Sequence, residues 1–516
     1  MKIERTKNAT RNIVFGALLK IYQILVPFLM RTAMIYFMGI QYLGLNSLFT
    51  SILQVLNLAE LGVGSAMVYS MYKPIAENDG KTICALMKLY KLYYRIIGAV
   101  IAVVGVILTP FVPYLIKSDL PPDLNVYVLY ILNLAATVVS YWLFAYKNSI
   151  LQAHQRVDVT SKVTLITNTI QYALQLLVII IVKNYYVYVI IALASQAMTN
   201  IVTAIAADKM YPDYRPAGDM DKEELKDINR RIKDLFTSKL GAVIVNSSDT
   251  VIISAFLGLT VLAVYQNYYF ILTSVIGFVT IIFNACTAGI GNSIVVETKE
   301  KNFNDLKKFT FLISWIAGFC VTCFLCLYQP FMKLWTGEKL MLGFAAVVCF
   351  CVYYFIYEIN QLLNTYKDAA GIWHEDRFRP LVTAGANLVM NLIMVNFWGI
   401  YGVLLSTVLS TLLIGMPWLL KNLFTVLFSR KQFPEYITKL FKYICISAFG
   451  AAATLGVCSL INLGDWANLI IRAIICCIVP NFIFYILYRK QPEFKQNVLL
   501  LDKVTKGKLK LSKLVK

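Results

Sequence analysis

The stretch IIGAVIAVVGVILTPFVPYLI, residues 96–116, carries no charged side chain. A helix of about 20 apolar residues is long enough to cross the roughly 30 Å hydrocarbon layer of a bilayer. Runs of this kind recur from one end of the 516-residue chain to the other. The bilayer is therefore the expected solvent for most of the protein.

The overall composition supports the same interpretation. Hydrophobic residues make up 59% of the chain and charged residues only 15%, whereas a soluble domain carries about 25% charged residues. We predict an all-α integral membrane protein with about fourteen transmembrane helices. The expected spans are 12–38, 45–71, 96–116, 126–146, 163–182, 186–206, 240–258, 262–286, 309–328, 342–365, 381–397, 401–420, 443–461 and 467–488.

The positive charge of the chain predicts its orientation rather than a nucleic-acid partner. With the N-terminus inside, 41 of the 48 Lys and Arg residues fall in the segments on the inner side. The outer loops hold only Lys117, Lys183, Lys333 and Lys339. This asymmetry follows the positive-inside rule. We therefore expect both termini in the cytoplasm and no nucleic-acid binding, although the formal net charge is +20.

The eleven cysteines lie almost all inside expected spans. Cys320, Cys323 and Cys326 are three residues apart, a spacing that rotates them progressively off one face of a helix, and no His or acidic residue accompanies them. We interpret them as packing thiols and expect neither a metal site nor a cofactor.

Two short matches indicate an internal duplication. Phe37-Met38-Gly39-Ile40 reappears as Phe256-Leu257-Gly258-Leu259, and Tyr146-Lys147 with His154 reappears as Tyr366-Lys367 with His374. Helices 1 to 6 should then resemble helices 7 to 12 as two pseudo-symmetric lobes, the arrangement in which transporters bind substrate between halves. The expected parts are an N-lobe at 1–206, a cytoplasmic inter-lobe loop at 207–239, a C-lobe at 240–420, two C-terminal helices at 421–488 and a basic cytoplasmic tail at 489–516.

Polar side chains form stripes along several expected spans. An ionisable group in hydrocarbon costs several kcal/mol unless it faces water or a partner, so each is a functional candidate. These stripes could line a shared aqueous chamber, or they could hydrogen-bond helix to helix. The members are Lys20, Gln23 and Arg31 in the first span, Asn46, Thr50, Gln54, Asn57 and Glu60 in the second, Thr164, Asn168, Gln171 and Gln175 in the fifth, Asn246 to Asp249 in the seventh, and Tyr354, Glu358, Gln361, Thr365 and Asp368 in and just after the tenth.

The sequence contains no recognisable catalytic motif. A phosphate-cradling Gly-rich loop followed by Lys-Ser or Lys-Thr is missing from the sequence. The sequence therefore gives no sign of a nucleotide-binding site that could drive transport. His154 and His374 both stand beside inner loops, without a nucleophile at a recognisable spacing. We expect a protein that is not an enzyme.

The run Tyr42-Leu43-Gly44-Leu45-Asn46-Ser47-Leu48-Phe49, continuing to Ala59-Glu60-Leu61-Gly62-Val63-Gly64-Ser65-Ala66, resembles bacterial polysaccharide flippases, the Wzx-like members of the MATE-like flippase superfamily. Tyr72-Lys73-Pro74 and the segment from Tyr366-Lys367-Asp368 to Arg379-Pro380 are similar to inner loops of that family. The resemblance extends over the whole chain in length, span count and loop order.

This resemblance implies a function. Such proteins move a sugar chain, attached through pyrophosphate to a polyprenyl carrier, from the inner to the outer leaflet of the bacterial plasma membrane by alternating access. The expected partners are the lipid-linked glycan, membrane lipids and a coupling ion, H⁺ or Na⁺, with the protein acting as a monomer. The pyrophosphate would need cationic groups, for which Arg31 and Lys20 are the candidates.

The remaining polar candidates divide into two roles. Amide, hydroxyl and aromatic surfaces would contact the sugars, and intramembrane acids would balance the cations or couple transport to an ion. The sugar-contact candidates are Asn46, Gln54, Asn57, Tyr265, Gln266, Asn267, Tyr354 and Gln361, and the acidic candidates are Glu60, Asp249 and Glu358.

Three alternatives remain open on sequence alone. A drug or metabolite exporter of the same superfamily would have a smaller chamber and usually twelve helices. A membrane enzyme of glycan assembly would need clustered acidic or His residues beside a sizeable loop. A lipid-linked peptidoglycan precursor is an alternative cargo for a flippase.

Overall fold

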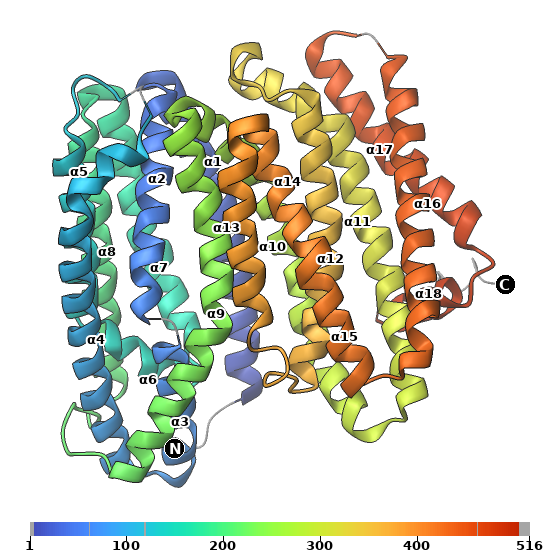
Figure 1. The fold of residues 1–516 in the computed structure, drawn as a ribbon. Helices are drawn as coiled ribbons and strands as arrows, with labels where there is room; N and C mark the ends of the chain where they lie inside the picture. Colours follow the sequence, from blue (N-terminus) through green and yellow to red (C-terminus); the bar gives the residue numbers. More distant parts are fainter. Residues whose placement is uncertain (1–4, 61, 118–119, 462, 505–516) are drawn as a thin grey trace. The chain divides into compact units, whose positions relative to one another are not determined.

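The computed structural model of the chain describes residues 5–60, 62–117, 120–461 and 463–504. Every regular element in these ranges is a helix, as Figure 1 shows. By their contacts the residues divide into two compact units, Met1–Ala263 (unit 1) and Val264–Lys516 (unit 2). The predicted all-α class is confirmed, while the part of the predicted basic tail from 505 to 516 lies outside the described residues.

Unit 1 contains nine α-helices and the start of a tenth among its described residues. They are α1 (Arg5–Phe37), α2 (Ile40–Leu56), α3 (Val63–Glu77), α4 (Gly80–Leu108), α5 (Val126–Trp142), α6 (Asn148–Ala153), α7 (Val157–Leu177), α8 (Tyr185–Met210), α9 (Lys222–Leu257) and the first residues of α10 (Leu259–Val296).

Unit 2 continues α10 and adds eight further α-helices in the described part of the chain. They are α11 (Lys299–Thr336), α12 (Phe344–Ala369), α13 (Arg379–Trp398), α14 (Ile400–Ser410), α15 (Met416–Val426), α16 (Phe433–Ser459), α17 (Asp465–Tyr488) and α18 (Pro492–Val504).

The number of membrane-spanning helices is close to the prediction. Twelve helices of the described residues are long and apolar enough to cross a bilayer, and α5 with α6, which meet at a bend of 49°, would make a thirteenth. Helix α2 is apolar but has only 17 residues. Each of the fourteen expected spans has a helical counterpart, so the count of fourteen is approximate and the multi-pass membrane class holds.

Polar residues in the connections set where several helices begin. The side chain of Asp79 accepts a hydrogen bond from the backbone N–H of Thr82 at the start of α4, and Asn125 accepts from Tyr127 and Val128 at the start of α5. Asn184 caps α8 in the same way. Such caps satisfy backbone N–H groups that a helix leaves unpaired at its first turn.

The prediction that residues 45–71 form one continuous span is wrong. Helix α2 ends at Leu56, a 3₁₀ turn (η1) covers Asn57–Glu60, and α3 starts at Val63. Gly62 lies between them with φ +90°, a left-handed conformation that other residues rarely adopt. A Cβ atom on Gly62 would come within 2.6 Å of Cβ of Leu235 on α9. Glycine therefore permits both the break and the close packing against α9.

The predicted inter-lobe loop at 207–239 is also shorter than expected. Helix α8 continues to Met210, and α9 starts at Lys222 with Asp221 as its N-cap. By its contacts α9 groups with unit 1, where it packs against α2 and α3. The compact-unit boundary falls at Ala263, inside the first turns of α10, and the predicted lobe boundary at residue 240 stays a prediction.

The first repeated motif has the same conformation in both copies. Gly39 separates α1 from α2 with φ +121°, and Gly258 separates α9 from α10 with φ +92°. Both glycines therefore end one long helix and start the next through a backbone conformation that favours glycine. This agreement supports the predicted duplication at the level of local structure.

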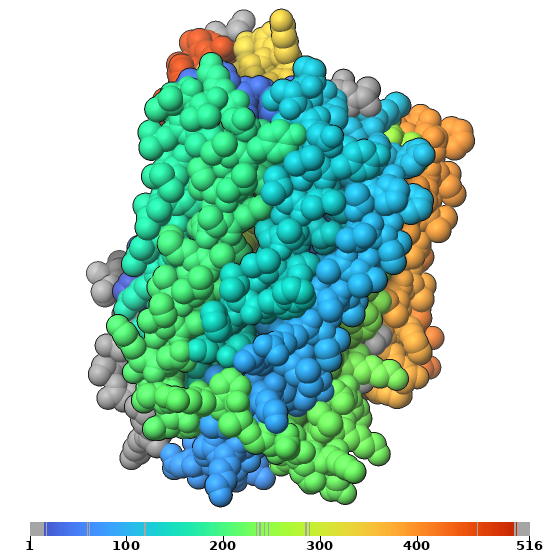
Figure 2. All heavy atoms as spheres, turned by 90° about the vertical axis from the view of Figure 1, so that its left-hand side faces the viewer, coloured from blue at the N-terminus to red at the C-terminus, as the bar shows by residue number. Residues whose placement is uncertain are grey.

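One face of unit 1 is built from α4, α5 and α8, which run side by side in Figure 2. Large apolar side chains project from each of these helices with more than a third of their surface exposed. An apolar face of this extent is what a helix needs to lie against lipid tails. Examples are Val103 and Ile107 on α4, Ile131 and Val139 on α5, and Ile190 and Ile205 on α8.

The helices beyond the predicted repeat pack on α11 in unit 2. Helices α16 and α17 contact α11 and each other, and α18 contacts α11. Phe494 and Val498 of α18 are buried in one cluster with Phe311 of α11. The first part of the predicted basic tail is thus a helix packed on α11, with Leu499 exposed.

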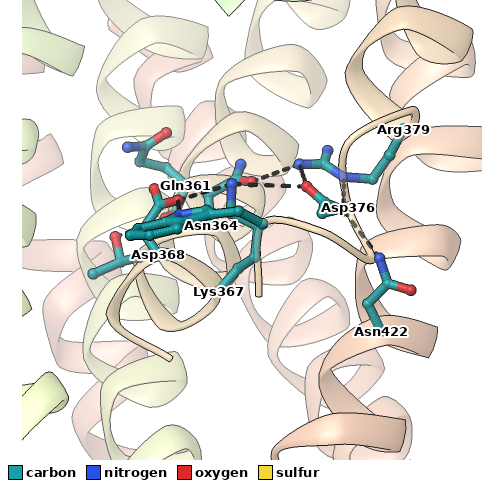
Figure 3. Close-up of polar contacts among 9 residues, drawn as sticks. Gln361, Asn364, Lys367, Asp368, Asp376, Arg379 and Asn422 are labelled. Atoms are coloured by element: carbon teal, nitrogen blue, oxygen red, sulfur yellow. Dashed lines mark hydrogen bonds and ion pairs between the residues drawn. The ribbon is translucent and has the colours of Figure 1, made fainter. Parts of the chain in front are cut away.

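A buried charged network ties α12, α13 and α15 together in unit 2 (Figure 3). Arg379 forms two hydrogen bonds to the Asp376 carboxylate, both of 2.7 Å, and a third of 2.8 Å to Oδ1 of Asn364. Asn422 on α15 donates to Oδ1 of Asp376 at 3.1 Å, and Nζ of Lys367 lies 3.7 Å from Oδ2. Asp376 and Arg379 are both nearly inaccessible to solvent. The sequence placed Lys367 and Arg379 in an inner loop and gave no sign that they meet.

We predict that Gly44→Ala destabilises unit 1. A Cβ atom there would lie 2.2 Å from the carbonyl oxygen of Leu259, so α2 must move away from the start of α10. Overpacking of this kind costs about 1–3 kcal/mol. Thermal unfolding of purified protein in detergent measures the effect. The matched control is Gly16→Ala on α1, where a Cβ would meet nothing within 4 Å, and equal melting temperatures for both variants would contradict the prediction.

We predict a larger loss of stability for Arg379→Ala. The substitution leaves the buried Asp376 carboxylate without its main partner, which costs roughly 3–5 kcal/mol. Arg377→Ala serves as the control because Arg377 is exposed two positions earlier in the chain. If both variants melt together with the parent, the network does not hold these helices.

Candidate functional site

A carboxylate lies where α2 breaks, and two tyrosines hold it. Oε1 of Glu60 accepts a hydrogen bond of 2.6 Å from Tyr94, and Oε2 accepts one of 2.8 Å from Tyr141. Tyr90 donates to the hydroxyl of Tyr94 at 2.6 Å and extends the chain of hydrogen bonds. Tyr141 also lies 3.1 Å from Oδ1 of Asn57. Hydrogen bonds to a charged acceptor are among the stronger ones, so the position of this carboxylate is well fixed.

Two hollows in unit 1 share this carboxylate. One has a volume of about 550 Å³ and the other about 470 Å³. Both are lined by Gln54, Asn57 and Glu60, so we treat them as one cavity, the Glu60 cavity. Its other polar lining residues are Thr50, Ser65, Tyr94, Asn133, Thr137, Ser140, Tyr141, Gln171, Gln196, Asn200 and Lys239.

The turn between α2 and α3 lies beside the cavity. The 3₁₀ turn at Asn57–Glu60 ends the regular helix, and Gly62 and Gly64 line the cavity beside it. Irregular backbone within a membrane is stable only where it is covered by protein or faces water. The polar cavity supplies that setting, so the predicted stripe in the second span lines a hollow at Gln54, Asn57 and Glu60.

Lys239 is the basic residue that the sequence interpretation missed. It lies on α9, lines the Glu60 cavity, and its Nζ donates to the hydroxyl of Ser65 at 3.2 Å. Arg231 lies two turns earlier on the same helix, 3.4 Å from the hydroxyl of Ser70 and with its guanidinium 4.9 Å from the ring centre of Tyr69. Both residues fell within the segment predicted as an inter-lobe loop, so they were counted as inner-side charges only.

The two predicted pyrophosphate ligands lie elsewhere in unit 1. Arg31 is partly buried in α1 and interacts electrostatically with Tyr188 on α8. Lys20 is exposed on α1. Neither residue is among the described residues that line the Glu60 cavity. The structure therefore brings Lys239, and not Arg31 or Lys20, to the side of Glu60.

Further polar residues of the cavity have the spacing of one helix face in the sequence. Asn133, Thr137 and Ser140 follow one another at intervals of four and three on α5, and Gln196 and Asn200 are four apart on α8. Such intervals place side chains on one face of a helix. Of the predicted sugar contacts in unit 1, Gln54 and Asn57 line the cavity; Asn46 is partly buried, and its backbone carbonyl accepts a hydrogen bond from Thr50.

Several candidates in unit 2 are buried within the helix packing. Tyr265 stacks between Tyr269 and Phe350 with 3% of its surface exposed, and Tyr354 packs edge-on against Phe324 with none exposed. Asn267 is fully buried as well, whereas Gln266 and Gln361 are partly exposed. In this conformation the rings of Tyr265 and Tyr354 contact neighbouring side chains and are covered from a ligand.

Glu358 on α12 is the most enclosed acidic candidate. It is 1% exposed, and neither oxygen of its carboxylate has a hydrogen-bond partner among the described residues. Tyr354 lies one turn before it on the same helix. A charged carboxylate without partners is very costly in an apolar interior. Asp249, the third acidic candidate, is partly buried on α9 in unit 1.

The second repeated motif has different environments in the two units. His154 is buried beside Tyr211 and Tyr214, whose ring centres lie 4.2 and 5.8 Å away, and this burial lowers the pKa of its imidazole. His374 is exposed, with Nδ1 3.3 Å from Arg377. Both histidines follow the end of a helix, His154 after α6 and His374 after α12, and their place on the inner side stays a prediction.

The sequence of this chain matches the profile of a known protein family. The sequence profile of the polysaccharide biosynthesis protein family matches residues 9–288. No curated protein matches the chain significantly.

Solved structures of transporters share the fold. The lipid II flippase MurJ in an inward closed conformation matches 92% of this chain and 99% of its own, with a TM-score of 0.62 at 14% identity. An inward-facing multidrug resistance MATE family transporter of the MOP superfamily matches 80% of this chain and 98% of its own, with a TM-score of 0.60 at 15% identity. A MOP superfamily transporter from Pyrococcus furiosus matches 81% and 95%, with a TM-score of 0.53 at 13% identity.

At these identities the likeness shows the fold alone, which is that of MurJ and the MATE transporters. The family profile covers more than half of the chain and includes every residue that lines the Glu60 cavity. The chain therefore belongs to the polysaccharide biosynthesis protein family, in agreement with the resemblance found in its sequence.

Proposed function

We propose that this protein flips a polyprenyl-pyrophosphate-linked oligosaccharide from the inner to the outer leaflet by alternating access, for the synthesis of cell-surface polysaccharide. The observation that carries the proposal is the Glu60 cavity. It lies in unit 1 of a membrane protein and is lined mainly by amide, hydroxyl and phenol groups, with one lysine.

The cavity has the chemistry that sugars require. Amide groups donate and accept hydrogen bonds at once, and hydroxyl groups do the same, so both match the hydroxyls of a sugar. Gln54, Asn57, Asn133, Gln171, Gln196 and Asn200 supply six amides. An apolar cargo would form no hydrogen bonds with these groups.

The pyrophosphate is assigned to cations at or near this cavity. Lys239 is the first candidate because its Nζ already lies at the cavity wall, held by the hydroxyl of Ser65. Arg231 stands closer to the start of α9, where an incoming headgroup would meet it first. Arg31 and Lys20 on α1 stay proposed ligands for a later stage of the movement, since neither lines the cavity in this conformation.

The lipid tail would remain in the bilayer beside the protein. The exposed apolar side chains of α4, α5 and α8 provide a surface for lipid tails in unit 1. The protein would act as a monomer in the bacterial inner membrane with both termini in the cytoplasm, an orientation supported by the distribution of Lys and Arg.

Energy coupling is assigned to the intramembrane acids. Glu60 lines the polar cavity and is held by two tyrosines, so we assign it as the acid that a proton or Na⁺ reaches from the cavity. Glu358 is suited to carry a proton, because only a neutral acid or an ion-bound carboxylate is stable in such an enclosed position. Asp249 is the third candidate.

The main alternative cargo is a drug or metabolite, since MATE family transporters share the fold. The number of amides in the cavity favours a sugar. The similar structures are of transporters, which favours transport over an enzyme of glycan assembly.

The decisive experiment is glycan export in a deletion strain that expresses variants of the protein. Lys239→Ala should reduce surface glycan about tenfold or more, since a hydrogen bond to a charged group contributes about 1.5–3 kcal/mol. Lys239→Arg should retain most of the export because it keeps the charge. Lipid-linked oligosaccharide should accumulate on the cytoplasmic side in the Lys239→Ala strain.

Matched variants separate the roles of the cations. Lys226→Ala, at an exposed position of the same helix α9, is the control and should export normally. Arg31→Ala and Arg31→Lys should both be expressed, with export falling more for Ala. Normal export in Lys239→Ala cells, at the parent's level of membrane protein, would remove Lys239 from the mechanism, and the same result for Arg31→Ala would remove Arg31.

Coupling is tested by neutralising the three acids one at a time, as Glu60→Gln, Asp249→Asn and Glu358→Gln. Flipping of a fluorescent lipid-linked oligosaccharide is measured in proteoliposomes under an imposed proton or sodium gradient. We expect Glu60→Gln to lose the gradient dependence, because this carboxylate lines the cavity. Glu224→Gln, exposed on α9, is the control. If all three variants respond as the parent does, the coupling group lies elsewhere.

A further inference from the structure

Three thiols from distant parts of the sequence converge inside unit 2. Cys326 lies on α11, Cys458 on α16 and Cys476 on α17, and their sulfur atoms all lie within 4.8 Å of one another. The three side chains are 0–1% exposed. Among the described residues, no other group of His, Cys, Asp and Glu side chains converges so closely.

The surroundings of the three thiols are apolar. Leu327, Leu455 and Ile475 pack against them, and Cys323 lies at the edge of the same cluster. Carboxylates and imidazoles take no part in the group. The cluster therefore offers soft sulfur donors only, in a pocket from which water is excluded.

We propose that unit 2 binds one Cu⁺ ion through the sulfur atoms of Cys326, Cys458 and Cys476. Sulfur ligands select soft ions, of which Cu⁺ is one. A structural Zn²⁺ site takes four ligands in a tetrahedron. Here three sulfur atoms lie within 4.8 Å of one another, and the thiol of Cys323 contacts Cys476 from outside this group. A metal–sulfur distance of about 2.3 Å would place three sulfurs around a central ion about 4 Å apart, within the observed limit of 4.8 Å.

Arg472 supplies the charge balance for such a site. It lies on α17 one turn before Cys476, its Nε donates to Oδ1 of Asn468 at 2.7 Å, and its positive charge interacts with Cys458 and Cys476. Thiols lose protons when they bind a metal. If two of the three bind as thiolates, two protons are released to water and the Cu⁺ complex carries one negative charge, which the guanidinium of Arg472 offsets.

The proposed ion would connect the C-terminal helices to the rest of unit 2. Helices α16 and α17 lie outside the predicted repeat, and both pack on α11. A ligand that binds only the folded state raises its stability. Cu⁺ would therefore join α11, α16 and α17 at one point within the membrane. This inference does not depend on the cargo of the transporter.

The test uses the full-length protein in lipid nanodiscs, reduced and kept without oxygen. Copper is supplied as the acetonitrile complex of Cu⁺, and bicinchoninate competes for it. We expect one tightly bound copper per chain, an X-ray absorption spectrum with three sulfur neighbours at about 2.3 Å, and a higher melting temperature with copper than without.

Variants identify the ligands. Replacement of all three residues, as Cys326→Ser with Cys458→Ser and Cys476→Ser, should abolish stoichiometric binding and the gain in melting temperature. The control is Cys445→Ser, at an exposed position of α16, which should bind as the parent does. Arg472→Gln should weaken binding at least tenfold without changing its stoichiometry, and Arg472→Lys should restore part of the affinity.

Several results would overturn the proposal. Copper that binds equally to the triple variant, or parent protein that binds none after reduction, would exclude the site. A disulfide between two of the three cysteines that persists under these conditions would do the same, as would four-coordinate Zn²⁺ held in preference to Cu⁺. If the triple variant does not fold, the absorption spectrum of the parent decides, because oxygen or nitrogen neighbours around copper would contradict three thiol ligands.

Discussion

In a bilayer core no water is present to pair with exposed backbone N–H and C=O groups. The rest of the structure depends on this constraint. It explains why the described chain is helical throughout, and why polar caps such as Asp79 and Asn125 stand where helices begin. It also limits where a helix can break. The break at Gly62 is stable because the freed groups face the Glu60 cavity and the packed surface of α9.

The same constraint acts on side chains. A carboxylate such as Glu60 is tolerated in the membrane because Tyr94 and Tyr141 donate to it and because the cavity is polar. Lys239 and the six amides add donors and acceptors to the lining of this cavity. A substrate with many hydroxyls and a charged headgroup satisfies such a lining better than an apolar one. Because burying polar groups without partners costs free energy, a polar cavity favours the proposed polar cargo.

In unit 2, buried polar side chains are satisfied by other means than a polar cavity. The unit's charged residues Asp376 and Arg379 are paired in a closed network, as Figure 3 shows, and its cysteines gather in an apolar cluster. Glu358 is the exception, since its carboxylate is enclosed without a partner among the described residues. The predicted duplication stays a prediction, to which the similar turns at Gly39 and Gly258 add a local structural likeness.

The sequence alone determined the membrane class, the approximate number of spans, the family resemblance and the presence of polar groups in the second span, because hydrophobic length and helical spacing are local properties. It could not determine which groups meet. The sequence placed Lys239 in a loop, whereas in the structure it lies on α9 and lines the same cavity as Glu60. Tyr354 was predicted to contact a sugar, but its ring packs against Phe324. Cys326 was interpreted as a packing thiol, and the structure places sulfur atoms from α16 and α17 beside it. Contacts between residues far apart in the chain depend on how whole helices pack, and only the tertiary structure contains that information.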